Sequence, residues 1–321
     1  AEPAPPGGGL AAAAGATKAF VSNVLPYYTL IIAGAALAHP PAFAWIGKEW
    51  WSVALTAIMV SVGINLEFKD FTTMPWKTVS LGLLISIAVR PLVAAAVVAV
   101  FSPPAAIAAG IYMLACVPVS TLCNFGTVVC SGNVPVSVML VALSTILSVA
   151  TTPLLAEALV GVSVQLDTMG MIKTIIDVVL LPVLFGLLMN QYLPAVASLL
   201  KVVLPFLGLA GATVCSGAPV AAHAAAMKSS MGLAVLPAVL ALHLGTLGGG
   251  FAASRVAGFA TAETRTVALG CSMLSSLLAV LLVSKHLPDP ASVVPCAISI
   301  ILMCSVGLIT AAVWSALDKR K

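Results

Sequence analysis

A short polar segment interrupts one of the long apolar stretches of this chain. It runs from Cys116 to Thr127 with the sequence CVPVSTLCNFGT, so proline, glycine, hydroxyl, thiol and amide groups stand where a membrane helix would be apolar. A helix in lipid must satisfy its own backbone, so such an interruption is tolerated only where it faces protein or a water-filled cavity. Broken helices of this kind hold the ion and substrate sites of secondary transporters. These residue types therefore favour binding of an ion or small solute inside the membrane.

The composition places most of the chain in a membrane. Of 321 residues, 61% are hydrophobic and 7% are charged, whereas a soluble domain has about 25% charged residues. Apolar runs of about 20 residues are typical of membrane helices, while β-barrel strands give alternating segments of about 10 residues. The sequence therefore predicts an all-α integral membrane protein with lipid as a partner. The net charge of +4 reflects basic loops and does not indicate a nucleic-acid partner.

Hydropathy and turn residues predict ten transmembrane helices. They are expected at residues 20–38, 44–66, 76–101, 104–131, 134–158, 169–191, 202–222, 231–254, 263–285 and 291–314. Five helices in each half give the halves opposite orientations, so two inverted repeats are predicted at residues 20–160 and 161–321. Residues 1–19 form a tail rich in Ala, Gly and Pro, which is expected to be flexible. The interrupted fourth helix then corresponds to the ninth, whose centre, Gly270 to Ser276, is also small and polar.

Lysine and arginine are more frequent in the loops on the side that would carry both termini. The positive-inside rule places both termini on the cytoplasmic side, or on the stromal side in a plastid envelope. The chain begins at Ala1, which fits either a precursor that has lost an organellar transit peptide or an arbitrary start.

Several segments resemble one transporter family in consistent order. Pro118 to Thr127, Gly132 to Val138 and Leu143 to Thr145 are similar to the PGGTASN, GDVALSV and STL patterns of the bile acid:sodium symporter family. Further similar segments are Gly63 to Phe71, Gly170 with Val178 to Leu184, Arg265 to Val267 and Lys285 to Pro290. The resemblance extends from about residue 20 to 314 and is carried by these segments together.

The resemblance implies a fold and a function. Helices 1, 2, 6 and 7 would form a panel domain, helices 3, 4, 5, 8, 9 and 10 a core domain, and the broken helices 4 and 9 would cross. The implied activity is secondary transport of organic anions such as bile acids, 2-keto acids or other carboxylates, by alternating access with sodium symport. The resemblance implies no cofactor apart from Na⁺. It also implies no catalytic residue and no enzyme activity.

The positions that resemble the family's sodium sites have lost oxygen ligands. Gly270 stands where the family has a glutamate and Leu274 where it has a glutamine. Cys123 replaces a serine and Val141 a threonine, while Asn124 keeps its amide. The degenerate set comprises Ser86, Cys123, Asn124, Ser137, Val141, Gly270, Cys271, Met273 and Leu274. A cation held by few neutral oxygens would not recover its hydration energy, so sodium-independent transport, exchange and proton coupling remain alternatives.

An arginine lies deep in the third predicted span. Arg90 precedes Pro91, and a charged residue at that depth costs about 2.5–3.5 kcal/mol on insertion scales and marks a functional site by default. Arg90 could supply the fixed positive charge that sodium supplies in relatives, and that charge would either support the crossing or attract the carboxylate of a substrate. Alternatively, Arg90 could pair with backbone carbonyls at a helix break. The substrate-binding candidates are Arg90, Thr121, Asn124, Thr127, Ser275 and Ser276.

Two further ionisable residues are candidate proton relays. Asp177 lies in the sixth span one turn after Lys173, which also fits an ordinary helix-end pair, and His243 lies mid-span among small residues that allow close packing. An enzyme using Cys123 or Ser120 as nucleophile is a weaker alternative, because no activating base is near in the sequence. A receptor that has lost transport is a third.

Overall fold

The computed structural model describes residues 27–161 and 166–319. The predicted helical class is confirmed for these residues, which form helices and no named strand. The first half contains the helix Tyr27–Ala38, η1 (Pro40–Phe43), α2 (Glu49–Ile64), α3 (Phe68–Thr73), α4 (Trp76–Phe101), α5 (Ala105–Cys116), α6 (Cys123–Val129) and α7 (Val134–Leu159). The second half contains α8 (Thr168–Ile175), η2 (Ile176–Leu180), α9 (Leu181–Tyr192), α10 (Pro194–Ala212), η3 (Thr213–Gly217), α11 (Ala218–Lys228), α12 (Ser230–Val256), α13 (Thr261–Ser272), α14 (Ser276–His286), η4 (Pro290–Ser292) and α15 (Val293–Asp318).

Every predicted span that falls in the described residues coincides with helical structure. Within residues 27–161 and 166–319, five helical units are long and apolar enough to cross a membrane: α4, α7, α8 to α9, α12 and η4 to α15. The spans predicted at 104–131 and 263–285 are each divided into two shorter helices, α5 and α6 in the first and α13 and α14 in the second. The prediction at 202–222 was wrong in extent, because helix starts at Pro194 and runs through the π-helical turn η3 to Lys228.

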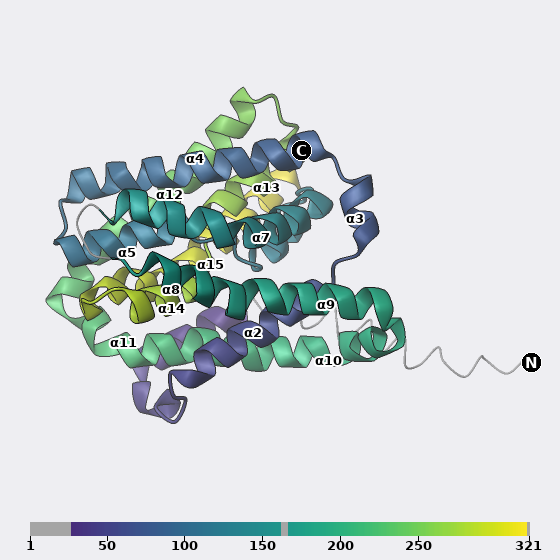
Figure 1. Cartoon of the computed structure of the whole chain (residues 1–321). Coiled ribbons are helices and arrows are strands. Elements are labelled where there is room, and N and C mark those ends of the chain that lie inside the picture. The colour runs from purple at the N-terminus through teal and green to yellow at the C-terminus, as the bar shows by residue number, and fades with distance from the viewer. Residues whose placement is uncertain (1–26, 162–165, 320–321) are drawn as a thin grey trace, which may run out of the picture.

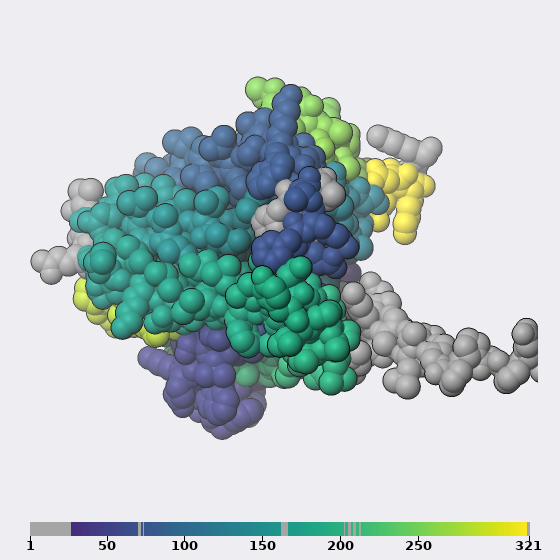
Figure 2. Space-filling model, turned by 45° about the vertical axis from the view of Figure 1, so that its right-hand side comes forward, coloured from purple at the N-terminus to yellow at the C-terminus, as the bar shows by residue number. Residues whose placement is uncertain are grey.

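The helices form two groups (Figure 1). α2, α9 and α10 pack against one another, and α4, α12, α13, α7 and α15 form the larger group. The turn between α9 and α10 lies beside α3 on the face that carries the C-terminal end of α15, as Figure 2 shows in green, blue and yellow.

Two glycines bring α2 and α9 into unusually close contact. A Cβ on Gly63 would lie 2.1 Å from the carbonyl oxygen of Val183, and one on Gly186 would lie 2.3 Å from the carbonyl oxygen of Val60. Only the absence of a side chain allows these backbones to approach so closely. The smaller group of helices is therefore built as a tightly packed unit.

Candidate functional site

The two broken helices meet at their breaks. Pro118, which lacks an N–H and cannot continue a helix, follows the end of α5, and Met273 follows the end of α13. The extended segments pair as a short antiparallel bridge between Val119 and Leu274. The amide of Ser120 donates to the carbonyl of Met273 at 2.8 Å, and the amide of Ser275 donates to the carbonyl of Pro118 at 3.0 Å. The bridge satisfies backbone groups that the breaks would otherwise leave unpaired in a buried setting.

Arg90 joins the same two breaks from the other side. Its side chain projects from α4 and is 4% exposed. One guanidinium nitrogen donates to the carbonyl of Val117 at 2.9 Å, and the other donates to the carbonyl of Gly270 at 2.7 Å. Val117 caps the C-terminal end of α5, and Gly270 lies in the last turn of α13. A cation at helix C-termini is favourable because the unpaired carbonyls there carry partial negative charge.

A cavity of about 440 Å³ lies between the two groups of helices, within the size range of about 300–1,000 Å³ of small-molecule sites. One side is formed by the helix Tyr27–Ala38, α2, η2, α10 and η3, and the other by the crossing, α7, α14 and α15. Most of its lining is apolar. The polar side chains that line it are Thr29, Ser61, Asn65, Ser120, Thr121, Asn124, Thr145, Lys201, Cys215, Ser216, Ser275 and Ser276.

The cavity gathers four of the six candidate substrate residues, Thr121, Asn124, Ser275 and Ser276. Thr127 is fully buried behind them, where its hydroxyl donates to Ser137 Oγ at 3.1 Å. Ser137 Oγ in turn donates to Asn124 Oδ1 at 2.7 Å. Arg90 lies outside this lining and instead borders a separate pocket of about 20 Å³. The Arg90 guanidinium therefore binds backbone carbonyls at the crossing, whereas side chains of the broken helices line the cavity.

Three of the degenerate sodium positions lie in an apolar cluster. Cys123, Val141 and Met273 are buried together with Val119 and Leu269 in one hydrophobic cluster. Ser86 Oγ contacts Cys271 Sγ at 3.4 Å, and Leu274 is fully buried at the bridge. Gly270 contributes its carbonyl to Arg90. Thiol, thioether and aliphatic groups are poor ligands for a hard cation, which prefers carboxylate, carbonyl and water oxygens.

His243 is completely buried in α12 and held at both ring nitrogens. Nδ1 lies 2.8 Å from the carbonyl oxygen of Ser272, and Nε2 lies 2.8 Å from Ser299 Oγ. Ser299 Oγ is 2.7 Å from Ser276 Oγ, which reaches the cavity. Because a carbonyl only accepts, Nδ1 carries the proton and the neutral Nε2 accepts from Ser299. A hydrogen-bonded chain thus connects the histidine to the cavity.

Asp177, the other candidate relay, is placed differently. It lies in the π-helical turn η2 and is exposed on the outer surface. The cavity lining includes its neighbour Val179 and not Asp177 itself. The structure therefore brings His243 near the cavity and leaves Asp177 apart from it.

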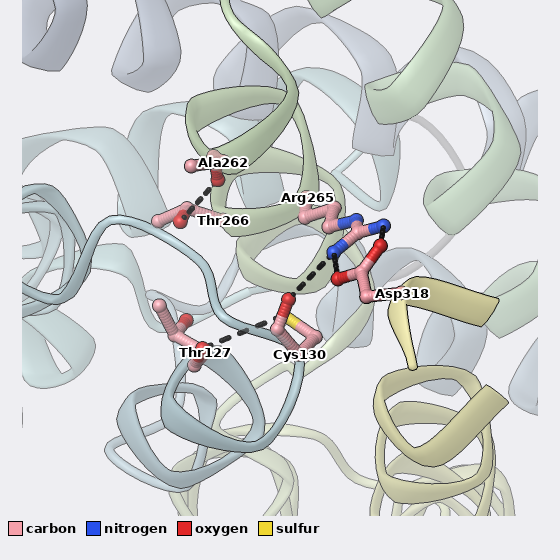
Figure 3. Close-up of polar contacts among 6 residues, drawn as sticks. All are labelled: Thr127, Cys130, Ala262, Arg265, Thr266 and Asp318. Carbon is pink, nitrogen blue, oxygen red and sulfur yellow. Dashed lines mark hydrogen bonds and ion pairs between the residues drawn. The ribbon is translucent and has the colours of Figure 1, made fainter. Parts of the chain in front are cut away.

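A second arginine, Arg265, links the C-terminal end of α6 to α13 and α15 (Figure 3). Arg265 of α13 donates to the carbonyl of Cys130 at 2.8 Å and forms a two-pronged ion pair with Asp318 at 2.5 and 2.8 Å. Its guanidinium carbon also lies 5.7 Å from the ring centre of Trp314. These contacts tie the end of α6 to α13 and α15. The sequence pointed to Arg265 only as part of a matching segment.

Lys201 lines the cavity, although it falls between the spans predicted at 169–191 and 202–222. The helix begins at Pro194, so Lys201 lies in its second turn and lines the cavity. Proline is common at the first position of a helix, and Pro194 was the available signal that this helix starts early.

This architecture, with crossed broken helices beside a cavity in an apolar helical protein, is that of a membrane transporter. The profile of the Sodium Bile acid symporter family matches residues 52–230, and the chain belongs to this family of transporters. It is 33% identical to the "Probable sodium/metabolite cotransporter BASS3, chloroplastic" of Arabidopsis thaliana over 92% of this chain and 69% of that protein. It is 34% identical to the rice protein (Oryza sativa subsp. japonica) of the same name over 94% of this chain and 72% of that protein. The rice "Probable sodium/metabolite cotransporter BASS1, chloroplastic" is 34% identical over 91% of this chain and 72% of its own length.

Proposed function

We propose that this protein is a secondary transporter of organic anions that works by alternating access without sodium at the degenerate positions. The observation that carries the proposal is the position of Arg90. Its guanidinium donates to one carbonyl from each broken helix, at 2.9 and 2.7 Å, where the C-terminal ends of half-helices coordinate Na⁺ in transporters with broken helices. A covalently attached cation needs no ion from solution to hold the crossing together.

The opposite ends of the broken helices suit an anion. α14 starts at Ser276, beside the cavity, and a helix N-terminus carries partial positive charge. Among the described lining residues there is no Asp or Glu, so no fixed negative charge opposes an anion there. Membership of the family and the apolar walls support a carboxylate with an apolar body as substrate.

The helix arrangement supports the panel and core division. The helices bordering one side of the cavity are the predicted helices 1, 2, 6 and 7, and the crossing with α7, α14 and α15 borders the other. The antiparallel bridge between the two breaks is the relation expected of inverted repeats. In this proposal the two groups move relative to one another and expose the cavity to each side in turn.

Chloroplastic relatives support a plastid envelope as the location. The excess of basic residues on the side of the termini supports a stromal position for both chain ends.

Proton coupling is the second candidate, because a hydrogen-bonded chain runs from His243 through Ser299 to Ser276 at the cavity. In the neutral state this chain is fully paired, which equally suits a structural role. Retention of pH-dependent uptake after the substitution His243→Gln would favour the structural role.

The proposal is tested by uptake of labelled 2-keto acids and taurocholate into proteoliposomes. Sodium, potassium and the pH gradient are varied one at a time at constant ionic strength. We expect saturable anion uptake that is equal in sodium and potassium. Saturable sodium dependence would overturn the sodium-independent mechanism, and absence of uptake of every anion would favour a receptor.

A further inference from the structure

The cavity has a single fixed charge among its described lining residues, and this charge is Lys201. Arg90 does not supply the charge of the cavity, because its side chain lies outside the lining and donates hydrogen bonds to two backbone carbonyls. His243 is fully buried and reaches the cavity only through two serine hydroxyls. The preference of the cavity for one sign of charge therefore depends on Lys201.

The surroundings hold the ammonium group in place without neutralising it. Lys201 Nζ donates to Asn190 Oδ1 at 3.1 Å, and Asn190 Nδ2 donates to the carbonyl of Leu66 at 2.8 Å. The acceptor of the ammonium is an uncharged amide oxygen, and an ammonium group has three donors. The carboxylate of Glu67 lies in the loop after α2, where a hydrogen bond and the charge of Lys69 lower its pKa and Lys201 contributes least. Glu67 is therefore paired chiefly with Lys69, at 2.5 Å.

The remaining lining carries polar and apolar groups on both sides of the cavity. Asn65 and Lys201 stand on the side formed by α2 and α10, while Ser120, Thr121, Asn124, Ser275 and Ser276 stand at the crossing. Leu55, Ile58, Phe125, Leu207 and Ile300 are among the apolar residues of the walls. A ligand that fills this space needs an anionic group for the ammonium, an apolar body, and a hydroxyl or carbonyl for the crossing.

We propose that Lys201 binds the anionic group of the substrate and thereby sets the preference of the cavity for anions. This inference rests on the proposed transport function. Asn190 positions Lys201, because the carbonyl of Leu66 holds the Asn190 amide and the amide oxygen accepts from the ammonium. A lysine suits this task because a flexible point charge follows a carboxylate as the helices move.

The charge preference is measured first without transport. The substitution Ser61→Cys, combined with Cys215→Ala, puts a reactive thiol in the half-exposed part of the lining. Its modification rate is compared for an anionic methanethiosulfonate, the sulfonatoethyl reagent, and a cationic one, the trimethylammonioethyl reagent. We expect the anionic-to-cationic rate ratio to fall about tenfold in Lys201→Gln. It should be kept in Lys201→Arg and in Lys77→Gln, an exposed lysine outside the cavity.

A variant with the lysine moved to a neighbouring position distinguishes loss of charge from a folding defect. Leu204 also lines the cavity, one turn along α10, so Lys201→Gln with Leu204→Lys should restore most of the ratio. An unchanged ratio in Lys201→Gln, or no recovery in the double variant, would overturn the proposal.

Uptake then tests carboxylate binding by Lys201. For 2-oxoisovalerate, Lys201→Gln should raise the half-saturating concentration about tenfold while leaving the maximal rate within about twofold. An unaltered half-saturating concentration would contradict carboxylate binding by Lys201. If the unmodified protein transports no anion, the transport function fails by itself, and the labelling ratio still decides whether Lys201 sets the charge of the cavity.

Discussion

The two ends of the breaks differ in what they face. The C-terminal ends of α5 and α13 face Arg90, which donates to a carbonyl of each. The N-terminal ends of α6 and α14 lie beside the cavity with Thr121, Asn124, Ser275 and Ser276 in its lining. One pair of ends is thus permanently satisfied by a cation of the protein, and the other is available to a ligand. In the proposed mechanism, this difference means that the protein supplies its own cation at the crossing and keeps the cavity side of the crossing for the substrate.

The largest expected effect comes from removing the attached cation. In Arg90→Ala the carbonyls of Val117 and Gly270 lose charged donors in a buried setting, at a cost of about 1.5–3 kcal/mol each. We expect uptake to fall at least about a hundredfold and the unfolding temperature in detergent to drop. Added methylguanidinium should restore part of the uptake. Arg90→Lys should recover less than the methylguanidinium-treated protein, because an ammonium cannot present the same planar fork.

Rebuilding the lost oxygen ligands should have the next largest effect. A Cβ on Gly270 would meet Val119 Cγ1 at 3.8 Å and Cys123 Sγ at 3.9 Å, so a Cβ fits there at ordinary contact distances. The triple variant Gly270→Glu, Cys123→Ser and Val141→Thr replaces the apolar cluster by oxygen ligands suited to a hard cation. We expect uptake by this variant to become sodium-dependent. Sodium-independent uptake in a folded triple variant would show that the cluster is not what excludes sodium.

A smaller effect is expected from the cavity side of the crossing. Asn124→Ala removes an amide that lines the cavity and accepts from Ser137 at 2.7 Å. We expect the half-saturating concentration for a 2-keto acid to rise several-fold to about tenfold, with a stability loss of about 1 kcal/mol for the lost hydrogen bond, because Ser137 Oγ keeps Cys123 Sγ as an acceptor at 3.8 Å. Thr127→Val provides a comparison, since Thr127 is buried and does not line the cavity. It should lower stability and leave the half-saturating concentration unchanged.

The smallest effect is expected at the far end of α13. Arg265 and Asp318 form a partly exposed ion pair, and such pairs contribute about 0.2–1 kcal/mol. Asp318→Asn should therefore change the thermal midpoint by no more than a few degrees and leave substrate affinity unaltered. Loss of uptake in this variant would move the critical contact from the breaks to the end of the crossing helices.

The sequence was sufficient for the helical class and for the two interrupted helices. Long apolar runs predicted α4, α7 and α12 closely, and Pro118 with its polar neighbours marked the first break. The partners of Arg90 were left open as two alternatives, because a backbone carbonyl has no sequence signature and its availability depends on where a helix ends. Lys201 was missed for a related reason, since hydropathy placed the helix start eight residues after Pro194. Contacts that depend on where helices end and on how helices pack can be identified only from the three-dimensional structure.

The central claim is that Arg90 replaces a bound sodium ion at the crossing. It is tested most directly by titrating sodium against the thermal unfolding midpoint of the purified protein, with potassium keeping the ionic strength constant. An ion that binds only the folded state raises this midpoint in a saturable way. We expect no difference between sodium and potassium up to several hundred millimolar. A saturable rise with sodium would contradict the account.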